Sequence, residues 1–273
     1  MKPAAVRRPL HTSRLAILED LYARLNHRAF VHPDPLEFLY HYDDVADREI
    51  AGFIAAALAY GNVKAILRSV ESVLDKMYSP ADFITTSSEK ALEAAFASFK
   101  HRFTTGWELC HLLIGMKRVL LEYASLENCF RAGLSCTDGS IVSTLSFLVQ
   151  ALSPDGSFSS LLPCPRRGSA CKRFCLFLRW MVRHDTVDPG GWTSLSPAQL
   201  IVPLDTHLFR LSRSIGFTAR HTPDMKAALE ITQAFREFSP RDPLRYDFSL
   251  TRLGMRSGLG YDQFLRQWHE TAC

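Results

Sequence analysis

The sequence has no apolar stretch long enough to cross a membrane, for which about 20 consecutive apolar residues are needed. The start of the chain carries positive charge, but no apolar segment of the kind found in secretory signals follows it. Four charged residues, Arg14, Glu19, Asp20 and Arg24, interrupt the helical pattern that comes next. We therefore expect a cytoplasmic location and no membrane partner.

The sequence also lacks a CxxC motif, an internal repeat, a low-complexity tract and any strand-like alternation of apolar and polar residues. A structural zinc site takes four ligands from closely paired motifs. The seven cysteines are scattered, and the nearest to a ligand pair are Cys171 and Cys175, four positions apart. The pattern of the seven cysteines predicts buried thiols in a reducing compartment. We expect no metal and no other cofactor.

Charge is present in ordinary amount but is unevenly placed. Hydrophobic residues make up 47% of the 273 residues and charged residues 22%, which is typical of a globular protein. Residues 161–273 contain 16 Lys and Arg against 10 Asp and Glu, whereas the first 160 residues contain 16 against 18. A basic second half suits a polyanion such as DNA, although it is equally compatible with a solvated basic surface.

Apolar residues recur with helical spacing almost throughout, which predicts an all-α fold. The run from Ile50 to Ala59 is apolar on every side and predicts a central buried helix within residues 44–60. The segment 153–168 is rich in Ser, Pro and Gly and is expected to be a loop. Further helices are expected at 13–28, 63–77, 88–100, 107–123, 126–132, 140–152, 169–183, 205–215, 224–238, 243–254 and 261–270.

Asp205 follows an apolar approach and stands at a predicted helix start. Asp is a favoured N-cap residue, so capping alone explains its position. Capping does not exclude catalysis, because the N–H groups and the dipole of a helix keep such a carboxylate charged where it faces a cleft. Asp205 is therefore a candidate both for a structural cap and for a catalytic group.

Lys172 lies in the first turn of another predicted apolar helix, close to Arg166, Arg167 and Arg173. Burial and neighbouring cations both favour the neutral form of a lysine, and an amine nucleophile must be neutral to react. The alternative is a solvated lysine on a basic turn. Lys172 is thus a candidate nucleophile.

The segment PLDTHLFR at residues 203–210, followed by Ile215 and Gly216, resembles the motif that carries the catalytic aspartate in endonuclease III-type glycosylases. These enzymes belong to the helix-hairpin-helix DNA glycosylase superfamily. Residues 54–65 are similar to the buried helix and polar turn that precede the substrate pocket there, and residues 246–254 resemble a late helix. The resemblance covers about two-thirds of the chain, and the aspartate motif is its most specific part.

The chain departs from that superfamily at two places. The usual hairpin sequence is replaced by LPCPRRG at residues 162–168, and Lys172 and Asp205 are 33 positions apart, which is a longer gap than usual. The gap is similar to that of the archaeal 8-oxoguanine glycosylases known as AGOG, whose hairpin is also atypical. The whole chain, through CKR at 171–173, FLRWMVR at 177–183 and PLDTH at 203–207, looks most like the bacterial domain-of-unknown-function family 2400.

The superfamily resemblance implies a two-lobed helical bundle with an atypical hairpin. One lobe would be residues 45–168, the other residues 1–44 with 169–273, and a cleft would separate them. It implies a monomeric DNA base-excision glycosylase with AP-lyase activity, in which Lys172 attacks the sugar and Asp205 assists. The residues expected at the substrate are Tyr60, Asn62, Phe174, Trp180 and His207, with Trp192 and Phe248 as further aromatic candidates. Those expected at DNA phosphates are Arg166, Arg167, Arg173, Arg179 and Arg210.

Two other hypotheses remain open from the sequence. The first is a protein that binds DNA or RNA on the same scaffold without breaking a bond, since a fold does not determine a function. The second is a helical protein-interaction module in which Lys172 has no special role. The departure from the usual hairpin favours single-stranded, bent or otherwise unusual nucleic acids over an ordinary duplex.

Overall fold

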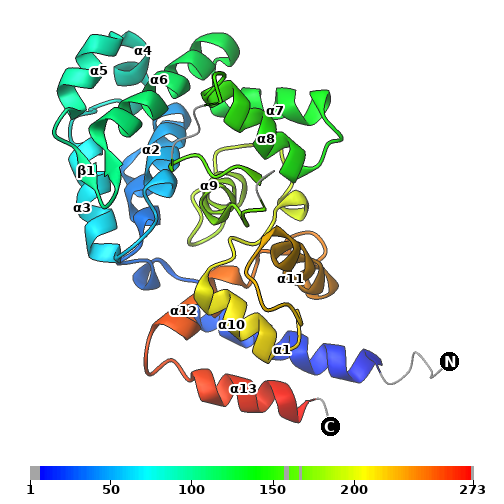
Figure 1. The fold of residues 1–273 in the computed structure, drawn as a ribbon. Helices are drawn as coiled ribbons and strands as arrows, with labels where there is room; N and C mark the ends of the chain where they lie inside the picture. Colours follow the sequence, from blue (N-terminus) through cyan, green and yellow to red (C-terminus); the bar gives the residue numbers. More distant parts are fainter. Residues whose placement is uncertain (1–6, 157–159, 166–167, 272–273) are drawn as a thin grey trace.

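A computed structural model of the chain describes residues 7–156, 160–165 and 168–271 and confirms the all-α prediction (Figure 1). The α-helices are α1 (Arg7–Leu25), α2 (Val45–Ala57), α3 (Val63–Leu74), α4 (Pro80–Thr86), α5 (Glu89–Phe96), α6 (Gly106–Tyr123), α7 (Leu126–Cys136), α8 (Ile141–Leu152), α9 (Lys172–Val182), α10 (Thr206–Ser214), α11 (Met225–Phe238), α12 (Asp247–Met255) and α13 (Tyr261–Glu270). Short 3-10 helices are η1 (Arg28–Phe30), η2 (Pro35–His41) and η4 (Pro197–Gln199). Two short antiparallel strands, β1 (Lys100–His101) and β2 (Thr104–Thr105), form a hairpin.

Helix α2 is the central buried helix that the sequence predicted. Asp44 is its N-cap and accepts hydrogen bonds from the backbone N–H groups of Ala46 and Asp47 at 2.8 and 3.2 Å. From Ile50 to Ala59 every residue is buried. The helix can be enclosed on all sides because Gly52 lets η2 and α9 approach closely, and a Cβ at this position would lie 3.1 Å from Leu39.

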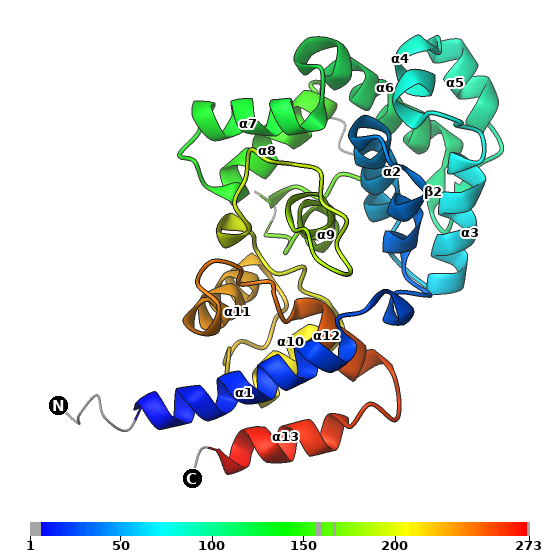
Figure 2. The ribbon, with the colours of Figure 1, turned by 180° about the vertical axis from the view of Figure 1, so that it is seen from behind.

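The helices form two groups with α9 between them (Figures 1 and 2). Helices α2 to α8 and the β-hairpin lie at one end of the molecule, and α9 packs along α2. Helices α1, α10, α12 and α13 lie together at the other end, where α12 contacts both α1 and α10. The division of the chain into two lobes at residues 45 and 168 stays a prediction.

A buried carboxylate joins α2 to α7. Glu49 is 2% exposed and accepts hydrogen bonds from the backbone N–H groups of Leu126 and Glu127, both at 2.8 Å, and from Trp192 Nε1 at 2.7 Å. The first two donors belong to the first turn of α7, where free N–H groups and the helix dipole favour a negative charge. Burial nevertheless raises the pKa of Glu49 to about 7.

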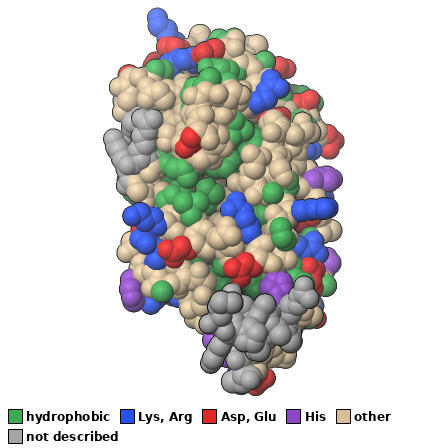
Figure 3. All heavy atoms as spheres, turned by 90° about the vertical axis from the view of Figure 1, so that its right-hand side faces the viewer, with side chains coloured by type: hydrophobic (Ala, Val, Ile, Leu, Met, Phe, Trp, Pro, Cys, Tyr) green, Lys and Arg blue, Asp and Glu red, His purple; other side chains and the backbone are tan. Residues whose placement is uncertain are grey.

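Within the described residues, no helix has the length and apolar character needed to cross a membrane. On the face formed by α7, α8 and α11, hydrophobic side chains gather in the upper middle, and charged side chains lie above them, along one edge and over the lower half (Figure 3). Exposed apolar patches can mark contact surfaces. A surface of this kind is compatible with a contact between protein chains, so the expected monomeric state stays a prediction.

Candidate functional site

A cavity of about 180 Å³ lies where α9, the start of α10 and α12 meet the connection between α2 and α3. A cavity of roughly 150 Å³ is able to hold a benzene ring, so this space suffices for one ring compound. The apolar part of its wall includes Tyr60, Leu176, Phe248 and Met255, and the charged part consists of Asp34, Lys172, Arg179, Asp205, Asp247 and Arg252. The two candidate catalytic residues, 33 positions apart in the sequence, thus line one cavity.

Helix α9 turns one face towards the cavity. Lys172, Leu176 and Arg179 all line it, as their spacing of four and three residues along a helix requires. Lys172 is the first residue of α9 and is half-buried. The residue before it, Cys171, has a left-handed conformation with φ 47° and ψ 35°, which costs a non-glycine residue on the order of 1 kcal/mol. Its N–H donates to Ser169 Oγ at 3.1 Å, and this turn sets the point at which the lysine enters the wall.

Asp205 is the N-cap of α10, as the sequence predicted. Its Oδ1 accepts a hydrogen bond from the backbone N–H of Leu208 at 2.7 Å. The side chain is half-buried and lines the cavity. The cap hydrogen bond uses Oδ1, so Asp205 caps its helix and lines the cavity at the same time.

Asp247, the first residue of α12, is a cavity residue that sequence reasoning missed. It is 1% exposed, and its Oδ2 accepts a hydrogen bond from Arg179 Nη1 at 2.5 Å. Its Oδ1 is buried and has no hydrogen-bond partner among the described residues. Burial raises the pKa of Asp247 to about 6; Arg179 opposes this shift, and the negative charges of Asp205 and Asp188 add to it. The cavity therefore contains a carboxyl group that exchanges its proton near neutral pH.

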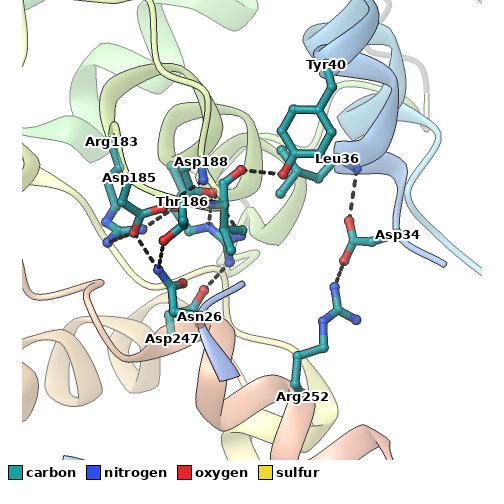
Figure 4. A network of polar contacts seen from close by, with 12 residues as sticks. Asn26, Asp34, Leu36, Tyr40, Arg183, Asp185, Thr186, Asp188, Asp247 and Arg252 are labelled. Atoms are coloured by element: carbon teal, nitrogen blue, oxygen red, sulfur yellow. Dashed lines mark hydrogen bonds and ion pairs between the residues drawn. The ribbon is translucent and has the colours of Figure 1, made fainter. Parts of the chain in front are cut away.

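Asp247 belongs to a buried network of arginines and aspartates that extends from the cavity into the protein (Figure 4). Arg179 pairs with Asp188 at 3.1 Å as well as with Asp247. Arg183 pairs with Asp188, with Asp185 at 2.9 Å and with Asp242 at 3.0 Å. Burial alone would raise the pKa of Asp185, but Arg183 and the backbone N–H groups of residues 187 and 188 outweigh it and lower the pKa to about 2. The network ties α9 to the loop that follows it and to the start of α12.

This network bears on Arg173 and Arg179, which the sequence placed among the residues expected at DNA phosphates. Arg179 and Arg183 are only 4% and 3% exposed, because each is paired with carboxylates inside the protein. Arg173 is half-buried and donates hydrogen bonds to the backbone oxygens of Ala57 at 2.6 Å and Ser160 at 2.5 Å. These three guanidinium groups hold the fold together and are not arranged along a solvent-exposed face.

A second ion pair, with a buried arginine and a half-buried aspartate, also lines the cavity. Arg252 on α12 pairs with Asp34, whose other oxygen caps η2 through the backbone N–H of Leu36 at 3.0 Å. The Nε atom of Arg252 is buried and has no partner among the described residues. Two residues that line the cavity thus each have one buried atom without a partner among the described residues. Asp247 Oδ1 is an acceptor, and Arg252 Nε is a donor.

The predicted aromatic substrate residues are divided between the cavity and the core. Tyr60 and Phe248 line the cavity. Phe174 and Trp180 are 3% and 1% exposed and do not line it; the ring of Phe174 packs 5.8 Å from that of Phe53. Trp192 is also buried, where it donates to Glu49. The structure therefore puts these three aromatic side chains in the general core, away from the place expected for them.

The predicted polar contacts are more exposed. Asn62 is exposed and caps α3 by accepting from the N–H of Lys64 at 3.0 Å. His207 and Arg210 are exposed on α10, outside the cavity wall. Arg166 and Arg167 lie outside the described residues. No group of three or more His, Cys, Asp or Glu side chains in the described part of the chain is arranged to hold a metal ion.

The fold and the cavity define an all-α protein with a small charged and aromatic pocket between its helices. Residues 34–256 match the family model described as "Protein of unknown function (DUF2400)". The match spans most of the sequence, so the chain belongs to this family, as the sequence segments had indicated. No curated protein and no solved structure matches the chain.

Proposed function

We propose that the protein is a DNA base-excision glycosylase with lyase activity, and that a flipped-out nucleotide enters the cavity beside Lys172. The observation that carries this proposal is the convergence of Lys172 and Asp205 on one cavity with room for a single ring compound. Enzymes that act on a base must take it out of the helical stack, and they hold it between apolar or aromatic groups. Tyr60 and Phe248 provide such groups here.

The proposed reaction begins with attack of Lys172 Nζ on C1′ of the sugar. The bond between C1′ and the base nitrogen breaks, and the base leaves with the bonding electron pair and takes up a proton. Opening of the sugar ring then gives a Schiff base between Nζ and C1′. Loss of a proton from C2′ expels the 3′ phosphate by β-elimination, and water finally releases the sugar fragment from the lysine.

The two carboxyl groups of the cavity have different roles in this proposal. Asp205 accepts the proton that the attacking amine must lose and stabilises positive charge on the sugar. Asp247 lies deeper, and its Oδ1 is free to bind an N–H group of the base. Because the pKa of Asp247 is raised to about 6, a fraction of the protein at neutral pH carries a proton there that is available to the leaving base.

Borohydride trapping tests the chemistry directly, because reduction of the Schiff base leaves a stable covalent bond between lysine and DNA. We expect an adduct with at least one oligonucleotide in a panel containing an abasic site, uracil, 8-oxoguanine and alkylated bases, each as single strand and duplex. Lys172→Gln should abolish the adduct. Asp205→Asn should lower its rate of formation by about 10²-fold or more, the effect typical of a lost proton acceptor.

Lys226→Gln is the matched control, since Lys226 is an exposed lysine on α11 outside the cavity wall. It should form the adduct as the wild type does. An adduct that survives Lys172→Gln, or no adduct with any oligonucleotide, would overturn the proposal.

The second candidate function is nucleic-acid binding without bond cleavage. It is favoured by a separate observation: the exposed ring of Phe103 stacks on Tyr60 beside the cavity, and this contact requires no chemistry from Lys172. Salt-dependent retention of oligonucleotides without an adduct, unchanged by Lys172→Gln, would select this function.

A further inference from the structure

The β-hairpin projects an exposed aromatic ring next to the cavity. Phe103, in the turn between β1 and β2, is 63% exposed. Its ring stacks on Tyr60, with ring centroids 5.1 Å apart and an angle of 25° between the planes. Tyr60 itself lines the cavity. Of the two stacked rings, Tyr60 is thus fixed at the cavity wall, while most of the Phe103 ring remains in solvent.

Several contacts hold the hairpin in this position. The buried ring of His101 bonds Ser69 Oγ on α3 through Nδ1 at 2.9 Å and the backbone oxygen of Tyr60 through Nε2 at 3.1 Å. The Tyr60 hydroxyl in turn donates to the backbone oxygen of His101 at 3.0 Å and shares a second hydrogen bond with the Thr104 hydroxyl, with 2.5 Å between the two oxygens. The exposed ring therefore stands on a support that is fixed by hydrogen bonds at both strands.

The turn has an unusual backbone conformation. Arg102 has φ 55°, a conformation that costs a non-glycine residue on the order of 1 kcal/mol. Its side chain crosses Gly61, which has φ 95° and where a Cβ would lie 2.6 Å from Arg102 Cδ. The glycine makes room for a guanidinium group at the edge of the cavity.

The surroundings of Phe103 are basic. Lys100 and Arg102 in the hairpin are exposed, as are Lys64 and Arg68 on α3, the helix that packs against β1. The guanidinium of Arg173 lies 5.2 Å from the centre of the Tyr60 ring, which is the ring that stacks with Phe103. Glu108, the acidic residue nearest to the hairpin in the sequence, is engaged in the capping box of Thr105 at the start of α6.

We infer that the Arg102–Phe103 turn is a stacking platform for an unpaired nucleotide next to the one held in the cavity. Bases of single-stranded nucleic acids stack on exposed aromatic rings, while neighbouring cations attract the phosphates. The inference rests on the proposed function for the occupant of the cavity, although its own test measures binding and not bond cleavage.

The test uses the full-length protein and a fluorescent single-stranded oligonucleotide with 2-aminopurine next to an abasic site. Phe103→Ala should weaken binding by about fivefold to hundredfold, the range expected for the loss of one stacked base. Phe103→Trp should retain the affinity, and Phe103→Leu should not, because a leucine is apolar but has no ring face. Quenching of 2-aminopurine on binding should disappear with Phe103→Ala.

Tyr78→Ala is the matched control. Tyr78 is a fully exposed aromatic residue between α3 and α4, and its loss should leave affinity and quenching unchanged. Arg102→Gln should lower the slope of log affinity against log salt by about one, as the loss of one phosphate contact does. Circular dichroism establishes that each variant is folded, which is expected because the replaced side chains are exposed.

The possible outcomes separate this inference from the proposed chemistry. Binding that falls with Phe103→Ala while no borohydride adduct forms supports the platform and refutes the glycosylase proposal. Equal affinity of Phe103→Ala and wild type overturns the platform, whether or not Lys172 forms an adduct. The inference is also overturned if the wild type binds none of the single strands.

Discussion

Replacing Asp247 with Asn should remove a pH dependence of stability that its buried carboxyl group imposes. Asp247 is 1% exposed, and its pKa is raised from 3.8 to about 6, chiefly by burial. A raised pKa means that the folded state binds the proton more tightly than the unfolded state does. The free energy of unfolding of the wild type should therefore fall as the pH rises from about 4 to about 6.

The size of the effect follows from the pKa difference. A change from 3.8 to about 6, at about 1.4 kcal/mol per pH unit, corresponds to about 3 kcal/mol. The carboxyl group is enclosed by protein, so solvent does not screen this energy as it does at a surface. The total stability of a domain is about 5–15 kcal/mol, and the effect is thus large enough to measure.

The assay is urea unfolding followed by circular dichroism at pH values from 4 to 8. Asn has nearly the same shape as Asp, and its amide oxygen is able to accept the hydrogen bond from Arg179. Near pH 4 the wild-type carboxyl group is mostly protonated and resembles the neutral amide, whereas above about pH 6 it carries a buried charge that the variant lacks. We expect the stability of Asp247→Asn relative to wild type to rise by about 3 kcal/mol between pH 4 and pH 7.

Other titrating groups cancel in this comparison because both proteins contain them. Glu49, with a pKa raised to about 7, adds a fall in stability between about pH 4.5 and 7, and Asp185, with a pKa lowered to about 2, loses its contribution only below about pH 4. Asp43→Asn, at an exposed aspartate, is the matched control for the loss of one carboxylate. A constant difference between Asp247→Asn and wild type across the whole range would refute the reasoning.

Three further predictions concern stability, each measured by urea unfolding at pH 8. Trp192→Phe removes the donor that reaches Glu49 at 2.7 Å in the core, so the free energy of unfolding should fall by about 1–3 kcal/mol; an unchanged value would mean that another donor takes its place. Gly115→Ala puts a Cβ 2.2 Å from the backbone oxygen of Leu152, where α6 and α8 meet, and should cost about 1–3 kcal/mol, whereas a stable variant would show that the two helices separate easily. Ile54→Ala truncates a fully buried side chain in α2 and should lower the free energy of unfolding by about 2–5 kcal/mol. A smaller loss would indicate that neighbouring side chains move into the space left by the isoleucine.

The sequence predicted those elements whose signals are local. Asp44 and Asp205 are N-caps in the structure, as their positions before apolar helical patterns indicated. Helix α13 has the predicted bounds, and α2 is the buried helix expected from its apolar run. Periodicity and capping depend on neighbours a few residues away, so one sequence contains enough information to place them.

Short elements and helix starts were harder to predict. Helix α4 was missed because it is only seven residues long, and the β-hairpin because its strands have two residues each and show no alternation. Helix α1 starts at Arg7, whereas Ser13 was predicted to cap it. A polar residue that is able to cap the N-terminus of a helix does not fix the helix start when the residues before it are helical as well.

The buried charges were beyond local reasoning. Arg179 and Arg183 lie on the inner face of α9, but charged residues are expected outside unless partners are present. Their partners Asp242 and Asp247 are 59 and 68 positions away in the sequence, and no local pattern connects them. Asp247 itself lay inside the helix predicted at residues 243–254, where no local pattern marked it. Its place in the cavity depends on the packing of α12 against α10, which only the folded chain defines.

Two of the buried polar atoms without hydrogen-bond partners belong to residues that line the cavity. Other buried charges differ in this respect: Glu49 has three donors and Arg183 has three carboxylates, whereas Arg14 Nε on α1 is also buried without a partner among the described residues. At the cavity, Asp247 Oδ1 and Arg252 Nε are buried without partners among the described residues. Each unpaired buried atom costs about 1–3 kcal/mol, and native proteins keep few of them. A ligand with an N–H group for Asp247 and an acceptor for Arg252 would recover this energy on binding. Under the proposed function this ligand is a nucleobase, whose edge carries both donors and acceptors, so pairing with these two atoms would favour a base over a ligand that lacks them.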